Sequence, residues 1–134
     1  MALLVRVVAI GASVPLLMRL SLPRLAAVLS MATGRTGMSG CPSEDHVQRV
    51  ATCVAAVQGG RVPLVRSGCL TRGVTLYWLL RRAGVPVELC FGMDKVDGEL
   101  AGHCWLVRDG RPYLEPAEFP DSFPAFYRIP APRP

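Results

Sequence analysis

The feature that most constrains the fold is a helix-like segment that begins at a cysteine and is followed by three strand-like segments. After Ser67-Gly68-Cys69, apolar residues recur at roughly helical spacing, and Arg81, Arg82 and Gly84 supply a basic last turn and a stop. This pattern predicts a helix of about four turns with Cys69 in its first turn. There the sulfur faces unpaired backbone N–H groups and the positive end of the helix dipole, which stabilise a thiolate.

The segments after this helix have the pattern of a small antiparallel sheet. A first strand is predicted from Val85 to Phe91 and a second from His103 to Arg108, with the charged residues 93–102 as an exposed loop between them. Asp109-Gly110 is a strong two-residue hairpin signal before a third strand, Arg111 to Leu114. The predicted order places a thiol at a helix start beside a sheet that carries a histidine, an α+β arrangement.

These residues resemble a known family. The segments CLTRGVTLYWLLRRAGVPVELCFGM and HCWLVRDGRPYLE are similar to the core of the lasso-peptide leader peptidases, the "B2" proteins of the transglutaminase-like cysteine protease superfamily. The shared elements are a Cys-Leu-x-Arg helix start, a Leu-Leu-Arg-Arg-x-Gly-Val helix end, and a His-x-Trp strand followed by Asp-Gly and a carboxylate. The resemblance implies a papain-like or transglutaminase-like core, with N-terminal helices and the nucleophile-bearing helix packed on the sheet.

The resemblance also implies a catalytic triad without metal or cofactor. Cys69 would be the nucleophile, His103 the general base and then the general acid, and Glu115 the residue that orients the imidazole, where aspartate is expected. Cys104 stands where alanine is usual. Peptide hydrolysis through an acyl-enzyme needs a partly ionised nucleophile, which a thiolate–imidazolium pair supplies. The backbone N–H of Cys69 could donate to the oxyanion, and the second donor is not identified by the sequence.

The turn at Asp109-Gly110 tests the third member of the triad. With a strict two-residue turn, Glu115 lies opposite Cys104 and points away from the His103 face, whereas a three-residue turn brings Glu115 diagonal to His103. The triad hypothesis therefore predicts a bulged or three-residue hairpin. With a strict turn, other acids become rivals for the third role: Asp109, Asp97 and Glu99.

The rest of the chain is predicted to complete a single domain of 134 residues. Residues 1–32 are apolar, but their longest uninterrupted run is too short to span a bilayer, so we expect two short core or interface helices split near Pro23. Contact with a membrane or partner surface is the alternative. Residues 33–42 are predicted to be a linker, and residues 43–115 the catalytic core. Within this core, a helix beginning near Ser43 is expected to pack on the Cys69 helix. The proline-rich residues 116–134 read as a wrapped or partly disordered tail that packs through its aromatic residues, Phe119, Phe123, Phe126 and Tyr127.

Composition narrows the class of partner and the compartment. The net charge of +5 suits an acidic peptide or protein partner, and no basic stripe with interleaved aromatic residues indicates nucleic acid. Five cysteines without a paired spacing or a convincing secretory signal predict a cytoplasmic chain with free thiols, in which Cys53 and Cys90 are core residues and His46 is a surface residue. A zinc site would have to use residues without paired spacing: Cys69, Cys90, His103 and Cys104.

The implied activity is that of a cysteine endopeptidase that removes the leader from a ribosomally made precursor peptide. By the resemblance, the exposed amine is then joined to a side-chain carboxylate by a separate ATP-dependent lasso cyclase. Family members that recognise the leader themselves carry an additional N-terminal domain, so a chain of this length is expected to rely on a separate leader-recognition protein. Two alternatives remain: another transglutaminase-like acyltransferase or amidase, and a non-catalytic interaction module on the same fold.

Overall fold

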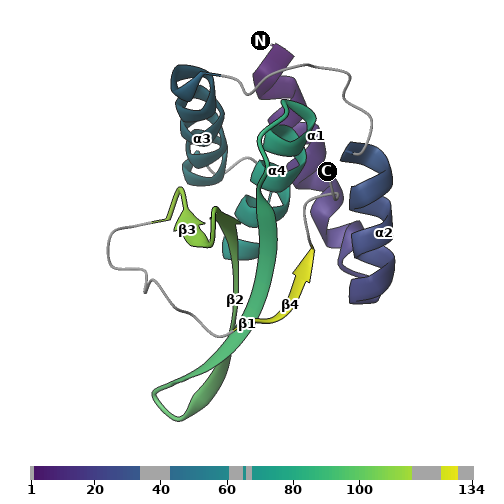
Figure 1. Cartoon of the computed structure of the whole chain (residues 1–134), viewed down its shortest axis with the longest axis vertical. Coiled ribbons are helices and arrows are strands. Elements are labelled where there is room, and N and C mark those ends of the chain that lie inside the picture. Colours follow the sequence, from purple (N-terminus) through teal and green to yellow (C-terminus); the bar gives the residue numbers. More distant parts are fainter. Residues whose placement is uncertain (1, 34–42, 61–64, 66–67, 116–124, 130–134) are drawn as a thin grey trace.

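The structure is a computed structural model that describes residues 2–33, 43–60, 65, 68–115 and 125–129 (Figure 1). Within these ranges, four helices precede four strands: α1 (Ala2–Leu17), α2 (Leu22–Thr33), α3 (Glu44–Gly59), α4 (Cys69–Arg82), β1 (Glu88–Val96), β2 (Glu99–Arg108), β3 (Arg111–Tyr113) and β4 (Ala125–Ile129). The strands form an antiparallel sheet in the order β3-β2-β1-β4. The predicted α+β class, with the Cys69 helix packed on a small antiparallel sheet, is confirmed.

Helix α4 is the central element of this arrangement. It contacts α1, α2 and α3 as well as β1 and β2, and Figure 1 shows it between α3 and the α1–α2 pair. Its side chains are buried on nearly every side of the helix, and four of them have no exposed surface: Val74, Leu76, Tyr77 and Leu80. A helix that is enclosed all round has little freedom to shift, so the residue at its start is held in a fixed place.

The described part of the N-terminal half consists mainly of helices, as predicted. The break between α1 and α2 falls at residues 18–21, so Pro23 lies in the first turn of α2, where its missing N–H is tolerated. Ser43 caps α3 by accepting a hydrogen bond from the His46 backbone N–H, and α3 packs on α4 as expected. His46 is exposed, as predicted. Among the described helices, none is both long and apolar enough to cross a membrane.

The hairpin of β1 and β2 is longer than the sequence predicted. Its ladder runs from Glu88↔Val107 to Val96↔Glu99 and closes on Asp97-Gly98, whose φ angles are 53° and 83°. The prediction that residues 93–102 form a loop is therefore wrong. Both central turn residues adopt the left-handed region, as a type I′ turn requires, and Asp-Gly is a preferred pair for it. The charged residues around the turn belong to strands that project beyond the rest of the sheet in Figure 1.

Two further strand boundaries differ from the prediction. Strand β1 begins at Glu88 rather than Val85, because the N–H groups of Val85 and Val87 bond to the Leu80 and Val85 carbonyls instead of to a neighbouring strand. Val85 and Val87 are nevertheless fully buried in the main core. Strand β3 ends at Tyr113, one residue early, because Leu114 has a φ of 59°.

The C-terminal segment contains a strand that the sequence reading missed. Strand β4 pairs with β1, where Leu89 lies opposite the fully buried Ile129. The Tyr127 ring contacts that of Phe91 at a centroid distance of 6.4 Å, so this part of the predicted aromatic packing is confirmed. Other parts of the prediction lie outside the described residues or side chains: the 34–42 part of the linker, Phe119, Phe123 and the Phe126 side chain.

Candidate active site

Cys69 is the first residue of α4, and it is exposed. The helix starts there because Gly68, at φ 143°, turns the chain in a conformation that other residues rarely adopt. The Gly68 carbonyl accepts the first helical hydrogen bond, from the Arg72 N–H at 3.1 Å. The prediction that Cys69 lies in the first turn of a helix is thus confirmed, and its sulfur is near the amide groups that the first turn leaves unpaired within the helix.

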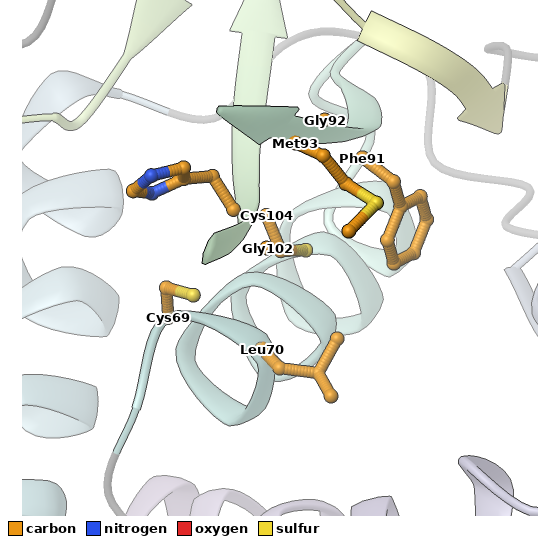
Figure 2. Close-up of a pocket in the computed structure, with 8 residues that line it drawn as sticks. Cys69, Leu70, Phe91, Gly92, Met93, Gly102 and Cys104 are labelled. Carbon is orange, nitrogen blue, oxygen red and sulfur yellow. The ribbon is translucent and has the colours of Figure 1, made fainter. Parts of the chain in front are cut away.

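Cys69 and His103 line the same pocket, which has a volume of about 260 Å³. Residues from three elements form its walls: Cys69 and Leu70 of α4, Phe91, Gly92 and Met93 of β1, and Gly102, His103 and Cys104 of β2. Figure 2 shows the Cys69 thiol at the start of α4, with Cys104 and Gly102 across from the helix. The structure therefore brings together the predicted nucleophile and the predicted base.

The remaining walls of this pocket are apolar or lack side chains. Leu70, Phe91 and Met93 form the apolar part. Gly92 lies directly opposite His103 in the ladder, and a Cβ atom at Gly102 would meet nothing within 4 Å, so space remains beside the imidazole-bearing residue. Sites for whole small molecules usually enclose about 300–1,000 Å³. A smaller, largely apolar pocket next to a thiol suits a single side chain of a longer substrate.

Gly73 allows α4 to pack closely on the sheet beside the pocket, a role that the sequence analysis did not predict. A Cβ atom there would lie 2.8 Å from the Cys104 Sγ and 3.2 Å from the Leu89 Cδ1, so α4 approaches the sheet closely at this point. Glycine within a helix is less favourable than alanine by about 1 kcal/mol, and such a residue often has a packing reason. A glycine inside the predicted helix, one turn after Cys69, was the feature of the sequence that could have indicated this close packing.

The other thiols near the site are buried. Cys104 is 5 % exposed, and burial, with the nearby Cys69 and Glu115 contributing, raises the pKa of its thiol far above the usual value. Cys90 is fully buried, as predicted, and burial raises its pKa to about 11. Cys53 is half-buried and packs against the core. Cys69 is the exposed cysteine among the four that the described segments contain.

The four residues considered for zinc do not gather at one place. Cys90 packs with Trp105 and Val107 in a small cluster, separate from the main core that contains Cys104 and Leu106, and it does not line the pocket. In the part of the chain that the structure describes, no group of three or more His, Cys, Asp or Glu side chains is placed to hold a metal ion.

The β2–β3 turn differs from the one that the triad hypothesis predicted. Arg108 pairs with Arg111, so Asp109-Gly110 is a strict two-residue turn, with φ angles of 54° and 79°. The expected bulged or three-residue hairpin is therefore wrong. Asp-Gly adopts the type I′ turn without a bulge because the aspartate tolerates the left-handed region and the glycine favours it.

Glu115 lies on the Cys104 side of β2. Its Oε1 accepts a hydrogen bond from the Arg72 Nη1 at 3.0 Å, and its carboxylate also accepts one from the Leu106 backbone N–H. Burial raises the pKa of Glu115, and these two donors oppose that rise. Side chains alternate along a strand, and Cys104 and Leu106 belong to the main core, so this placement agrees with the register of a strict turn.

The rival acids are remote from the pocket. Asp109 is 89 % exposed and lies 4.0 Å from the Arg108 Nε, and Asp97 and Glu99 are exposed at the far end of the β1–β2 hairpin. Neither these acids nor Glu115 belongs to the pocket walls. The structure thus places Cys69 and His103 in the walls of one pocket and gives Glu115 a partner, Arg72, that the sequence analysis did not consider.

Comparison with known proteins agrees with this architecture. Residues 11–128, which include α4 and the pocket walls, match the family model described as Transglutaminase-like superfamily. No curated protein and no solved structure matches the chain significantly. Since the family model spans most of the sequence, the chain belongs to the transglutaminase-like superfamily.

Proposed function

We propose that this chain is a cysteine endopeptidase that removes the leader from a lasso-peptide precursor. The observation that carries the proposal is that Cys69, at a helix start, and His103, on a strand, line one pocket. The superfamily includes cysteine peptidases. The Cys-Leu-x-Arg and His-x-Trp motifs, which both lie at this pocket or next to it, resemble those of the leader peptidases.

In the proposed reaction, His103 accepts the Cys69 proton and the thiolate attacks the scissile carbonyl carbon. The backbone N–H at the start of α4 stabilises the oxyanion, and the imidazolium protonates the leaving amine, which departs as the N-terminus of the core peptide. Water, deprotonated by His103, then attacks the thioester, releases the leader carboxylate and restores the thiol. The released amine would be the substrate of the separate ATP-dependent cyclase.

The pocket suggests which substrates would be cleaved. Leu70, Phe91 and Met93 offer an apolar surface beside Cys69, and burial of apolar area contributes about 25 cal/mol per Å². We propose that this surface receives an apolar side chain next to the scissile bond. A charged side chain would lose its hydration against this surface, where Leu70, Phe91 and Met93 offer no opposite charge.

We propose that a separate leader-recognition protein docks on the outer face of α1 and α2. Five large apolar side chains are exposed on these helices: Leu4, Val5, Leu16, Val28 and Met31. Arg6, Arg19 and Arg24 are exposed near them, and residues 1–33 contain no acid, so the complementary surface would be apolar with an acidic rim. The double variant L16D/M31D should lose stimulation by the partner, whereas Gln48→Asp on α3 should retain it.

The test of the proposal is the mass of the products formed from a candidate precursor peptide, with and without its leader-recognition protein. Endoproteolysis gives two fragments whose masses sum to that of the precursor plus one water. Membership of the transglutaminase-like superfamily also supports an acyltransferase or an amidase. Either enzyme would use Cys69 and His103, but the acyltransferase would pass the acyl group to an acceptor other than water, and the amidase would cleave another kind of amide bond. A product in which the acyl group is joined to an amine would favour that alternative. A non-catalytic module would give no product and an unreactive Cys69.

A further inference from the structure

We infer that Arg72 and Glu115 form a positioning pair, through which Glu115 acts on the placement of Cys69 rather than on the imidazole of His103. This inference rests on the proposed function, because it concerns how the nucleophile is held. It assigns a role to Arg72, and it changes the role that the resemblance gives to Glu115.

The contacts of Arg72 join α4 to the end of β3. Its Nη1 donates to the Glu115 Oε1 at 3.0 Å, and its Nη2 donates to the Leu114 backbone carbonyl. The Glu115 side chain is 10 % exposed and that of Arg72 is 27 % exposed, so solvent screens the pair only in part. Two donors of one planar guanidinium thus form hydrogen bonds with two neighbouring residues. This geometry fixes the orientation of the Arg72 side chain as well as its distance from Glu115.

Glu115 continues this connection into β2. Its carboxylate accepts the Leu106 backbone N–H, and Leu106 lies on the same strand as His103. The left-handed conformation of Leu114, at φ 59°, ends β3 and turns the chain toward α4. The first turn of α4 is therefore linked to the strand of the base through a short chain of polar contacts.

The position of Arg72 makes this link relevant to Cys69. Residues three apart are neighbours on a helix surface, and the Arg72 N–H makes the first hydrogen bond of α4, to Gly68. Gly73, the next residue, lies close to the Cys104 and Leu89 side chains. The first turn is thus held by packing at Gly73 and by the ion pair at Arg72, and a small displacement of a reacting group can reduce a rate about a hundredfold.

The two roles for Glu115 predict different results for the variants Glu115→Gln, Arg72→Met and R72M/E115Q. Glutamine keeps an oxygen that can accept from Arg72 but loses the charge. As a positioning residue, Glu115 should tolerate this change, with kcat of Glu115→Gln within about tenfold of wild type and an unaltered pH profile, whereas Arg72→Met should lose about 10- to 100-fold in kcat at similar KM. If Glu115 instead contacted the imidazole directly, Glu115→Gln should lower kcat by up to about ten-thousandfold and shift the pH profile.

The first measurement is kcat, KM and the pH profile of precursor cleavage, with Glu44→Gln as the control. Glu44 is also an acid paired with an arginine, Arg108 at 3.6 Å, but its side chain is 71 % exposed. The inference is supported if Arg72→Met is impaired more than Glu115→Gln and the double variant is no worse than Arg72→Met. It is overturned if Arg72→Met cleaves like wild type while Glu115→Gln is inactive.

A second readout does not depend on peptidase activity. The rate of Cys69 alkylation by iodoacetamide, followed by peptide mass mapping, should change in Arg72→Met and Glu115→Ala by similar factors, and no further in R72M/E115A, because all three variants break one link. An altered rate in Glu115→Ala with a wild-type rate in Arg72→Met would overturn the inference even if no precursor is cleaved. Circular dichroism of each variant identifies any that fails to fold, and Arg72→Lys, which keeps the charge but cannot grip both acceptors, then replaces Arg72→Met.

Discussion

Cys69 and His103 line one pocket because α4 meets the sheet at a glycine. At Gly73 the helix has no side chain to separate it from Cys104, the residue that follows His103 on β2. The backbone of α4 therefore packs directly against the Cys104 and Leu89 side chains of the sheet. The first prediction concerns this contact.

Substitution of Gly73 by alanine should destabilise the fold. The added Cβ would lie 2.8 Å from the Cys104 Sγ, and overpacking of this kind typically costs about 1–3 kcal/mol, which exceeds the helix-propensity gain of about 1 kcal/mol. The double variant G73A/C104A should recover much of the loss, because it removes the nearest atom. Urea unfolding of both variants measures the effect. An unchanged midpoint for Gly73→Ala would show that the helix does not pack closely at this residue.

Iodoacetamide at neutral pH should label Cys69 well before Cys90 and Cys104. Cys69 is exposed, whereas the other two thiols are buried, with the pKa of Cys90 raised to about 11 and that of Cys104 raised further. Only the thiolate reacts, so the two buried thiols should be labelled only after unfolding. Peptide mass mapping after a short reaction identifies the labelled residues. Labelling of Cys104 as fast as that of Cys69 would contradict the described burial.

The contribution of Glu115 to the stability of the chain should fall as pH rises through the weakly acidic range. Burial raises its pKa above the ordinary value of 4.5, so between the unfolded and folded pKa values the folded chain binds more protons than the unfolded chain. Stability associated with this proton is present below the unfolded pKa and is lost above the folded one. Comparison of urea midpoints across this range should show a flatter pH profile for Glu115→Gln than for wild type. Parallel profiles would mean that the pKa of Glu115 is not raised.

The apolar pocket should determine which peptides are cleaved. Gly102 lines the pocket and has open space at its Cβ position, so Gly102→Leu should fold normally and reduce the cleavage of peptides with a large apolar residue at the scissile bond. Peptides with glycine or alanine there should be less affected. Ala101→Leu, a neighbouring change outside the pocket walls, is the matched control. Equal losses for large and small residues would show that the pocket does not select the side chain.

Local patterns predicted the elements of this site well. The helical spacing after Cys69, the stop at Gly84 and the hairpin signal at Asp109-Gly110 all correspond to described elements, because each depends on residues close together in the chain. The same hairpin signal at Asp97-Gly98 was outweighed by the surrounding charges, which suggested a loop. The charges are compatible with strands here because that part of the hairpin is exposed.

Contacts between residues far apart in the chain could not be predicted from local sequence patterns. The Arg72–Glu115 ion pair joins residues on α4 and after β3, and nothing in the spacing of either residue specifies the other. The pairing of β4 with β1 was missed for a similar reason, since the surrounding prolines suggested an irregular tail. Even the role of Gly73 depends on what packs against it, which the helix sequence alone does not contain.

The most direct test of the account is cleavage of a candidate precursor peptide by wild type, Cys69→Ala and His103→Ala, each assayed in the presence of the leader-recognition protein. The account predicts cleavage by wild type and a loss of at least about a thousandfold in kcat/KM for each variant, because the thiol and the imidazole act as one unit. Retained binding of the precursor by the variants would show that the loss lies in the reaction itself. Cleavage by Cys69→Ala at the wild-type rate would contradict the assignment of the nucleophile and the proposed mechanism.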